Sequence, residues 1–412
     1  MTAEFLFYII LGIVCADFIF DQVLDYLNSK KFNDPVPELL SDVYNEEAYK
    51  KSQNYKKDTN RISQLSSWLS FVGILLFLIF DGFAFVDNLA REFSSNPILV
   101  ALIFFGIIML ASDIVSTPFS YYSTFVIEEK YGFNKMTKKT FWLDKLKGLL
   151  LGSILGGIIL SLIIWFFQLF PDTFWIYALI LVAVFSIVMN MFYAKLIVPL
   201  FNKQTPLGEG SLRDKIESYA KTVGFKLDNI FVIDGSKRST KANAYFSGFG
   251  PQKRITLYDT LIEDLSEDEI VAVLAHEVGH YKHKHIVYNL TLSILLTGIT
   301  LWLLSIFVSS PILSEALGVE EVSFHIGLVA FGLLYSPIST LTGLLMNALS
   351  RKFEYQADNY AKRTFNARDL VNALKNLTRK SLSNLTPHPL YVKVNYSHPS
   401  LLQRVKNLKK QH

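Results

Sequence analysis

Residues 273–285 read VLAHEVGHYKHKH and place His276, Glu277 and His280 on what the pattern predicts to be one continuous helix. Side chains four positions apart share one helix face at about 6 Å, so the two imidazoles can converge on one metal ion. Glu277 then lies beside that ion, where a carboxylate can take a proton from an attacking water. The stretch therefore indicates a zinc hydrolase with one Zn²⁺ per chain.

The sequence around this motif supports the same interpretation. Ser266 followed by Glu269 is a capping box that marks a helix start. No proline follows before Phe307, so the helix is predicted to continue past the motif. The alternative, two solvent-facing histidines on a polar helix, does not explain the apolar residues on either side.

The composition indicates a multi-pass membrane protein, because 51% of the 412 residues are apolar and long uncharged runs recur. The single cysteine, Cys15, excludes intramolecular disulfides and a cysteine-ligated zinc site. The first apolar run follows MTAE, which carries no positive side chain, so we interpret it as a span rather than a signal peptide. Seven spans are predicted, at residues 5–24, 68–85, 97–119, 148–170, 174–197, 286–308 and 324–345.

Lysine and arginine alternate across these spans and predict their orientation. Four connections hold seven, six, twelve and thirteen such residues, whereas the three between them hold one, none and none. This positive-inside pattern predicts an external or lumenal amino terminus and a cytoplasmic HEVGH segment and carboxy tail. The net charge of +4 is thus a topology signal, and no nucleic-acid partner is expected.

The predicted fold is an all-α membrane protein with a small α+β zinc metallopeptidase insert on the cytoplasmic side. In residues 199–285, a helix near 212–223 precedes strand-like runs at 230–234, 243–249 and 254–258. An edge strand there can pair with an extended substrate near the membrane surface. We predict four parts: residues 1–198 with five spans, 199–285 with the metallopeptidase segment, 286–348 with two spans, and 349–412 completing the zinc site.

A third protein ligand must come from outside the motif helix. His283 lies seven residues from His276, too far to share one ion. Glu354, in ALSRKFEYQADNYAKR, is the candidate, with Asp358 one turn later to accept a hydrogen bond from a ligand histidine. The alternative is a surface face on which these carboxylates pair with Arg351 and Lys362.

The sequence resembles the integral-membrane type I CAAX prenyl proteases. The resemblance rests on HEVGH, EYQAD, EEKYGFNK (128–135), FNKQTPL, NAYFSGFG and SHPS, and covers almost the whole chain. It implies a ring of seven helices around a water-filled chamber and cleavage near the C-terminus of prenylated substrates. It also implies roles for nine residues: the zinc ligands His276, His280 and Glu354; the catalytic base Glu277; the substrate-pairing Asn243, Ala244 and Tyr245; His398 at the reacting carbonyl; and Arg404 nearby.

Two features leave alternatives open from the residues alone. His398, taken by itself, is equally a surface or capping histidine. Polar residues in the spans either line a hydrated chamber, as we expect for Asp113 in mid-span, or mark the interface, as we expect for Asp21, Asp81 and Lys195. Asp17, in the first span, belongs to the same group.

Other functions remain to be distinguished. A seven-span transporter or receptor with an accidental HExxH would bind no metal. A site-2-type protease would carry an LDG motif on a later span, which is absent. General quality control of membrane proteins, as in the HtpX type, is the alternative within the protease class.

The expected partners are a prenylated or membrane-associated substrate and lipid, with the chain a monomer. The expected membrane is the endoplasmic reticulum or inner nuclear membrane in a eukaryote and the cytoplasmic membrane in a bacterium. Lys409 and Lys410 suit a dilysine retrieval signal or plain solvated charge.

Overall fold

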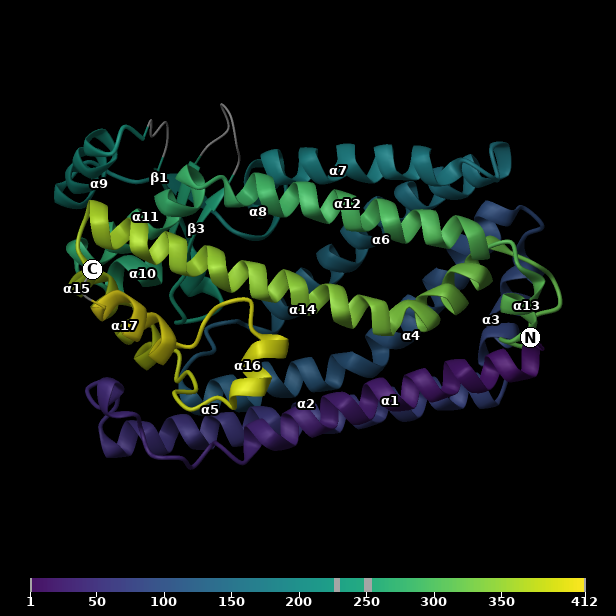
Figure 1. Ribbon diagram of the computed structural model, residues 1–412, viewed down its shortest axis with the longest axis horizontal. Helices are drawn as coiled ribbons and strands as arrows, with labels where there is room; N and C mark the ends of the chain where they lie inside the picture. The colour runs from purple at the N-terminus through teal and green to yellow at the C-terminus, as the bar shows by residue number, and fades with distance from the viewer. Residues whose placement is uncertain (1, 226–229, 248–253, 411–412) are drawn as a thin grey trace.

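The computed structural model describes residues 2–225, 230–247 and 254–410, and long helices lying side by side dominate it (Figure 1). Seven of the described helices are long and apolar enough to cross a membrane, which confirms the predicted number of spans. They are α1 (Ala3–Ser29), α2 (Glu46–Ile79), α4 (Pro97–Tyr122), α6 (Lys138–Leu169), α7 (Phe174–Leu196), α12 (His285–Phe307) and α14 (Phe324–Thr364).

The seven helices form a closed ring in chain order. Each contacts the next along the sequence, and α14 closes the ring by packing on α1. Short helices α3 (Gly82–Phe93) and α13 (Pro311–Glu315) lie with the amino terminus at one end of the ring, and the carboxy-terminal helices lie at the other (Figure 1).

The middle of this ring is hollow. In a packed bundle, the inward side chains at mid-height are buried, yet the middle of each described span contains no buried residue. Because the ring is closed, these side chains face either the surroundings or an unfilled interior. The unburied stretches are 11–23, 56–77, 105–116, 138–163, 179–193, 286–303 and 332–352.

Close packing is confined to the two ends of the ring. At the amino-terminal end, fully buried Ile10, Phe104 and Ile326 join α1, α4 and α14. Phe174 and Leu304 hold α7 and α12 together at the same end. The largest cluster lies at the opposite end and joins the sheet to the helices that carry the candidate site.

Two of the polar groups inside the spans, Asp113 and Asp17, have partners in the structure. Asp113 on α4 forms an ion pair of 2.7 Å with Lys145 on α6, and Asp17 on α1 accepts a hydrogen bond from Ser336 on α14. Pairing of this kind offsets the cost of placing charge at membrane depth.

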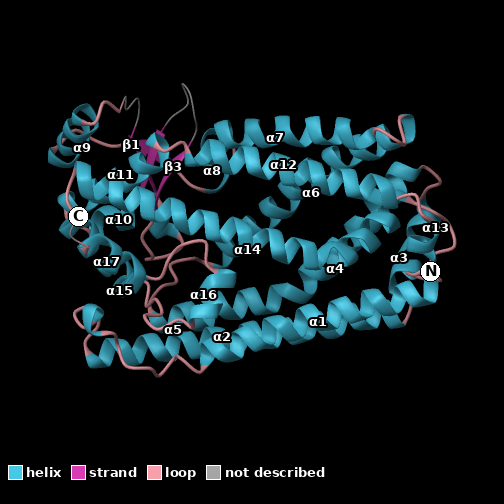
Figure 2. Cartoon of the chain, viewed as in Figure 1, coloured by secondary structure: helices cyan, strands magenta, loops and turns pink. Residues whose placement is uncertain are grey.

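A small sheet and short helices cover the carboxy-terminal end of the ring (Figure 2). The strand order is β1-β2-β4-β3, with β2 parallel to β4 and the other two pairs antiparallel. The elements of this region are α8 (Val198–Phe201), β1 (Gln204–Pro206), α9 (Ser211–Thr222), β2 (Ile230–Ile233), η3 (Gly235–Lys237), β3 (Ala244–Ser247), β4 (Arg254–Tyr258), α10 (Asp259–Asp264), α11 (Glu267–Lys282), α15 (Ala367–Lys380), α16 (Pro389–Asn395) and α17 (Leu401–Lys409). The remaining elements are η1 (Glu38–Leu40), the π-helical η2 (Ser123–Glu128) and α5 (Glu129–Tyr131).

The predicted helix near 212–223 and the three strand-like runs are present, although residues 248–249 of the second run lie outside the described residues. One strand was not expected. Gln204–Pro206, which precedes the predicted helix, pairs with β2 as an edge strand. Pro206 is tolerated at an edge because its missing N–H has no ladder partner to satisfy.

Two predicted helix boundaries are wrong. The second span ends at Ile79 rather than Phe85, because Asp81 adopts a left-handed conformation (φ 51°) and α3 starts anew at Gly82. The motif helix does not continue to Phe307: α11 ends at Lys282, Lys284 is left-handed (φ 58°), and α12 begins at His285. Neither break carries a proline, so the sequence pattern did not reveal them.

We expect Lys284→Gly to raise the melting temperature of the detergent-solubilised protein, because glycine removes the cost of a left-handed lysine, up to about 1 kcal/mol. The control is Lys352→Gly inside α14, where glycine should lower the melting temperature. If Lys284→Gly lowered the melting temperature as much as Lys352→Gly, the backbone of Lys284 would not be strained.

Candidate metal centre

Two helices carry the candidate site, and both are well defined by their sequences. The predicted capping box is confirmed at the start of α11: the Glu269 backbone N–H donates to Ser266 Oγ, and the Ser266 N–H donates to the Glu269 carboxylate. Helix α14 is 41 residues long, so the same helix contains the seventh span and Glu354. The site therefore joins a capped helix outside the ring to an extension of a span.

Gly279 allows α11 and α14 to approach each other closely. A β-carbon at this position would lie 3.0 Å from the Ala357 Cα and 3.1 Å from the Ala357 carbonyl oxygen. Those atoms belong to the backbone of α14, so they cannot give way as a flexible side chain would. The glycine in HEVGH thus sets the spacing between the histidine helix and the carboxylate helix.

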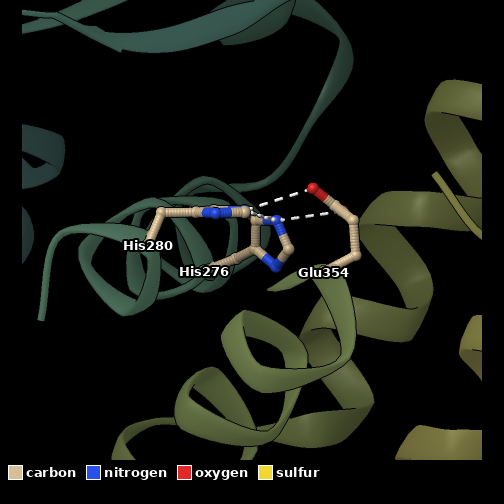
Figure 3. Close-up of side chains that lie close together, drawn as sticks. All are labelled: His276, His280 and Glu354. Atoms are coloured by element: carbon tan, nitrogen blue, oxygen red, sulfur yellow. Dashed lines mark hydrogen bonds and ion pairs between the residues drawn. The ribbon is translucent and has the colours of Figure 1, made fainter. Parts of the chain in front are cut away.

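His276, His280 and Glu354 converge across this helix contact (Figure 3). His280 Nε2 lies 3.2 Å from Glu354 Oε1, and His276 Nε2 lies 3.5 Å from Glu354 Oε2. The two Nε2 atoms are 3.1 Å apart. Each residue offers one ligand atom, and these atoms all lie within 4.8 Å of one another.

The far side of the His276 ring contacts an aspartate. His276 Nδ1 lies 2.9 Å from Asp358 Oδ1 and 3.3 Å from the Arg404 guanidinium. Asp358 is the closer group and, when ionised, can only accept, so Nδ1 carries a proton and Nε2 presents a lone pair to the site. Arg404, whose side chain is 11% exposed, forms a two-pronged ion pair with the same Asp358.

His280 is oriented in the same way by a different partner. Its Nδ1 lies 3.0 Å from His285 Nδ1, and His285 Nε2 lies 2.9 Å from Gln356 Oε1. The Nε2 lone pair of His280 therefore also points at the Glu354 carboxylate.

The donor set fits a divalent metal ion. Two imidazole lone pairs and a carboxylate face one point. Each histidine uses its Nδ1 proton for its other hydrogen bond, so neither Nε2 atom has to carry a proton. Glu354 Oε2 is buried without a hydrogen-bond partner among the described residues. Arg404 Nη1 lies 3.4 Å from this oxygen without forming a hydrogen bond, so a metal ion would satisfy it more fully. Two histidines and one glutamate are a ligand set typical of catalytic zinc sites.

Glu277 and His398 lie at the same cavity, which has a volume of about 470 Å³. His398 Nε2 is 3.2 Å from Glu354 Oε1, its Nδ1 is 2.9 Å from Ser397 Oγ, and its side chain is 62% exposed at the rim. Arg404 also lines this cavity. The structure thus brings every metal-site and catalytic candidate from the sequence into one place.

Three of the predicted substrate-binding residues line the same cavity. Ala244 and Tyr245 lie on β3, and Asn243 immediately precedes it. Among the described residues, β3 is the outer strand of the sheet, with β4 as its one partner. Its outer edge is therefore available for pairing with an extended chain.

Two ion pairs attach the segment before β3 to the ring, and no pattern in the sequence indicates them. Arg238 forms a two-pronged pair with Asp144 on α6, at 2.7 and 2.9 Å. Lys241 lies 2.8 Å from Glu128 on η2, whose carboxylate also accepts from Tyr55. Such pairings depend on the three-dimensional fold, so the spacing of charges along the chain does not predict them.

Comparison with known protein families covers almost the whole chain. Residues 25–203 match the family model described as CAAX prenyl protease N-terminal, five membrane helices. Residues 206–412 match the model of peptidase family M48.

Individual relatives agree with the family matches. CAAX prenyl protease 1 of Saccharomyces cerevisiae is 36% identical, over 96% of this chain and 94% of the relative. The human CAAX prenyl protease 1 homolog is 34% identical, over 92% of this chain and 90% of its own length. The crystal structure of S. mikatae Ste24p superposes with a TM-score of 0.93 at 36% identity and covers 98% of this chain and 99% of that one.

We expect Gly279→Ala to weaken metal binding, because the added methyl group separates the histidines from Glu354. Metal content after dialysis against a graded series of chelator concentrations measures the loss. Gly343→Ala on α14 is the matched control, since a β-carbon there meets nothing within 4 Å. Equal metal retention by the two variants would show that the close approach does not set the site.

Metal affinity should rise with pH up to about 9. Burial and Arg404 favour the neutral imidazole of His276, but hydrogen bonds to Asp358 and Glu354 outweigh them and raise the pKa of metal-free His276 to about 9. Below that pH a metal ion must displace a proton, which costs up to about tenfold in affinity per pH unit. Chelator competition between about pH 6.5 and 8.5 measures the slope, and Asp358→Asn should flatten it. A flat profile in the wild type would contradict this assignment.

Proposed function

This chain belongs to the M48 peptidase family, in its CAAX prenyl protease branch, and from that premise we propose that it is a zinc-dependent membrane endopeptidase that cleaves prenylated proteins near a carboxy-terminal CAAX motif. The observation that carries the proposal is the convergence of two imidazole lone pairs and the Glu354 carboxylate beside Glu277. The geometry supplies ligands for one ion and a neighbouring base, which is the minimum that such a hydrolase requires.

His276, His280 and Glu354 are the proposed zinc ligands. Bound there, zinc would lower the pKa of a water molecule to near neutrality and polarise the scissile carbonyl. Asp358 holds the His276 ring by accepting its Nδ1 proton at 2.9 Å, and Arg404 neutralises that carboxylate. These outer contacts fix the ligand geometry before substrate enters.

Glu277 is the proposed general base. Its carboxylate takes a proton from the water that attacks the peptide carbonyl and returns it to the leaving amine. His398 stands at the rim with Nε2 directed at the site, so its N–H can donate to the oxyanion that forms. Arg404 lines the same cavity and adds positive charge close to that oxygen.

The substrate backbone is proposed to pair with β3. Asn243, Ala244 and Tyr245 offer main-chain hydrogen bonds along an outer strand that borders the cavity. The cavity also has an apolar wall that suits the aliphatic side chains of a CAAX sequence, formed by Leu261, Val273, Leu370, Leu374 and Leu377.

We propose that the site and the carboxy terminus face the cytoplasm, on the basis of the lysine and arginine distribution. The chain would then lie in the endoplasmic reticulum or inner nuclear membrane of a eukaryote, or the cytoplasmic membrane of a bacterium. It is proposed to act as a monomer surrounded by lipid, with the four parts 1–198, 199–285, 286–348 and 349–412 as its working units.

Family membership excludes a receptor or transporter with an accidental HExxH. Within the protease class, quality-control cleavage differs from CAAX processing in one measurable respect: it does not depend on a prenyl group. Comparing a farnesylated CAAX peptide with the same peptide lacking the farnesyl group therefore separates these two activities.

We expect Glu277→Gln to reduce cleavage of the farnesylated peptide by at least about 100-fold, because the amide cannot accept the proton. The variant should still bind one zinc per chain, since the ligand atoms are unchanged. Product analysis by mass spectrometry and elemental analysis of the same preparation measure both properties.

Glu267→Gln is the matched control, because Glu267 lies in the first turn of the same helix and does not line the cavity. It should cleave at the wild-type rate. Near-wild-type turnover by Glu277→Gln would refute the proposed role of the base, and wild-type protein without zinc would refute the metal site.

A further inference from the structure

His285 is a buried histidine that the proposed catalytic roles do not use. It begins α12, its residue is 2% exposed, and its ring stacks on Phe353 with centroids 4.1 Å apart and planes 11° apart. Both ring nitrogens are engaged: Nδ1 faces His280 at 3.0 Å, and Nε2 faces the Gln356 side-chain oxygen at 2.9 Å. A side chain that stacks on Phe353 and is engaged at both nitrogens can transmit a defined hydrogen-bond direction.

The break at Lys284 creates this contact. In an unbroken helix, residues five positions apart point about 140° away from each other, so His285 would face away from His280. Because Lys284 adopts the left-handed conformation, α12 starts in a new direction and the two rings meet with centroids 5.0 Å apart. The break is therefore part of how the site is built.

The direction of the hydrogen bonds among Gln356, His285 and His280 follows from Gln356. Gln356 presents its carbonyl oxygen, which can only accept, so the proton of a neutral His285 lies on Nε2. His285 Nδ1 is then an acceptor, and His280 must donate from Nδ1. The remaining nitrogen of His280, Nε2, keeps its lone pair and lies 3.2 Å from Glu354 Oε1 in the candidate metal site.

We propose that His285 and Gln356 are positioning residues that form a neutral hydrogen-bond relay, which holds His280 in the tautomer and orientation needed to bind zinc. This inference rests on the zinc site of the proposed function. The two ligand histidines are then supported differently: His276 by the anionic Asp358 paired with Arg404, and His280 by two groups without charge. A neutral support fixes the His280 ring without adding a second negative charge behind the ligands.

The test compares zinc affinity, by chelator competition at one pH, for variants of the full-length protein in detergent. His285→Phe keeps a flat ring on Phe353 but removes the acceptor, and it should weaken zinc binding about 10- to 100-fold. His285→Asn restores an acceptor oxygen close to the position of Nδ1 and should recover most of the loss. Gln356→Met should weaken binding less than His285→Phe, whereas Gln356→Glu keeps an acceptor and should bind more tightly than Gln356→Met.

His283→Asn is the matched control. His283 is exposed and stacks beside His285 at 5.5 Å, but it has no place in the relay, so its loss should leave zinc affinity unchanged. Melting temperatures of the metal-free variants separate a packing defect from a loss of orientation.

Wild-type zinc affinity in His285→Phe would overturn the relay. So would equal losses in His285→Phe and His285→Asn together with lowered metal-free melting temperatures, because that result indicates packing alone. A wild-type protein that binds one zinc but does not cleave the farnesylated peptide would contradict the proposed function and leave the relay standing. A wild-type protein without zinc would overturn both.

Discussion

The contact between α11 and α14 is the constraint on which the rest of the site depends. These helices come from separate parts of the chain, and neither carries a complete set of metal ligands. Because Gly279 has no side chain, the two backbones approach closely enough for imidazoles on one helix to meet a carboxylate on the other. Asp358, one turn beyond Glu354, then contacts His276 from the same rod, so a single helix contact sets both the ligands and their support.

The site lies at the carboxy-terminal end of the hollow ring, and its cavity is also lined by Ile286, Asn289 and Ser350 of α12 and α14. Close packing occurs at the two ends of the ring, and the spans between them leave an interior that their side chains do not fill. The sheet is held to the ring by Arg238–Asp144 and Lys241–Glu128, which fixes the outer strand relative to the metal-binding helices. The membrane helices therefore hold the peptidase centre in position, and α14 supplies its third metal ligand, Glu354.

The sequence predicted the parts of the site that depend on local spacing. HEVGH places two ligands on one helix face, and EYQAD places Glu354 and Asp358 one turn apart, so regular helix geometry was sufficient to find them. It did not predict the left-handed Lys284, because lysine carries no bias toward that conformation, and it therefore did not predict the contact between His285 and His280. The strand at Gln204–Pro206 and the ion pairs before β3 arise from contacts distant in sequence, which no periodic pattern records.

The continuity of α14 has a mechanical consequence. From Phe324 to Glu354 the helix rises about 45 Å with Pro337 in its interior, so Glu354 is attached to the seventh span by continuous helix. Because α11 packs on α14 at Gly279, the histidine helix would follow the carboxylate when the span changes its tilt. The metal ligands would therefore keep their spacing in bilayers of different thickness.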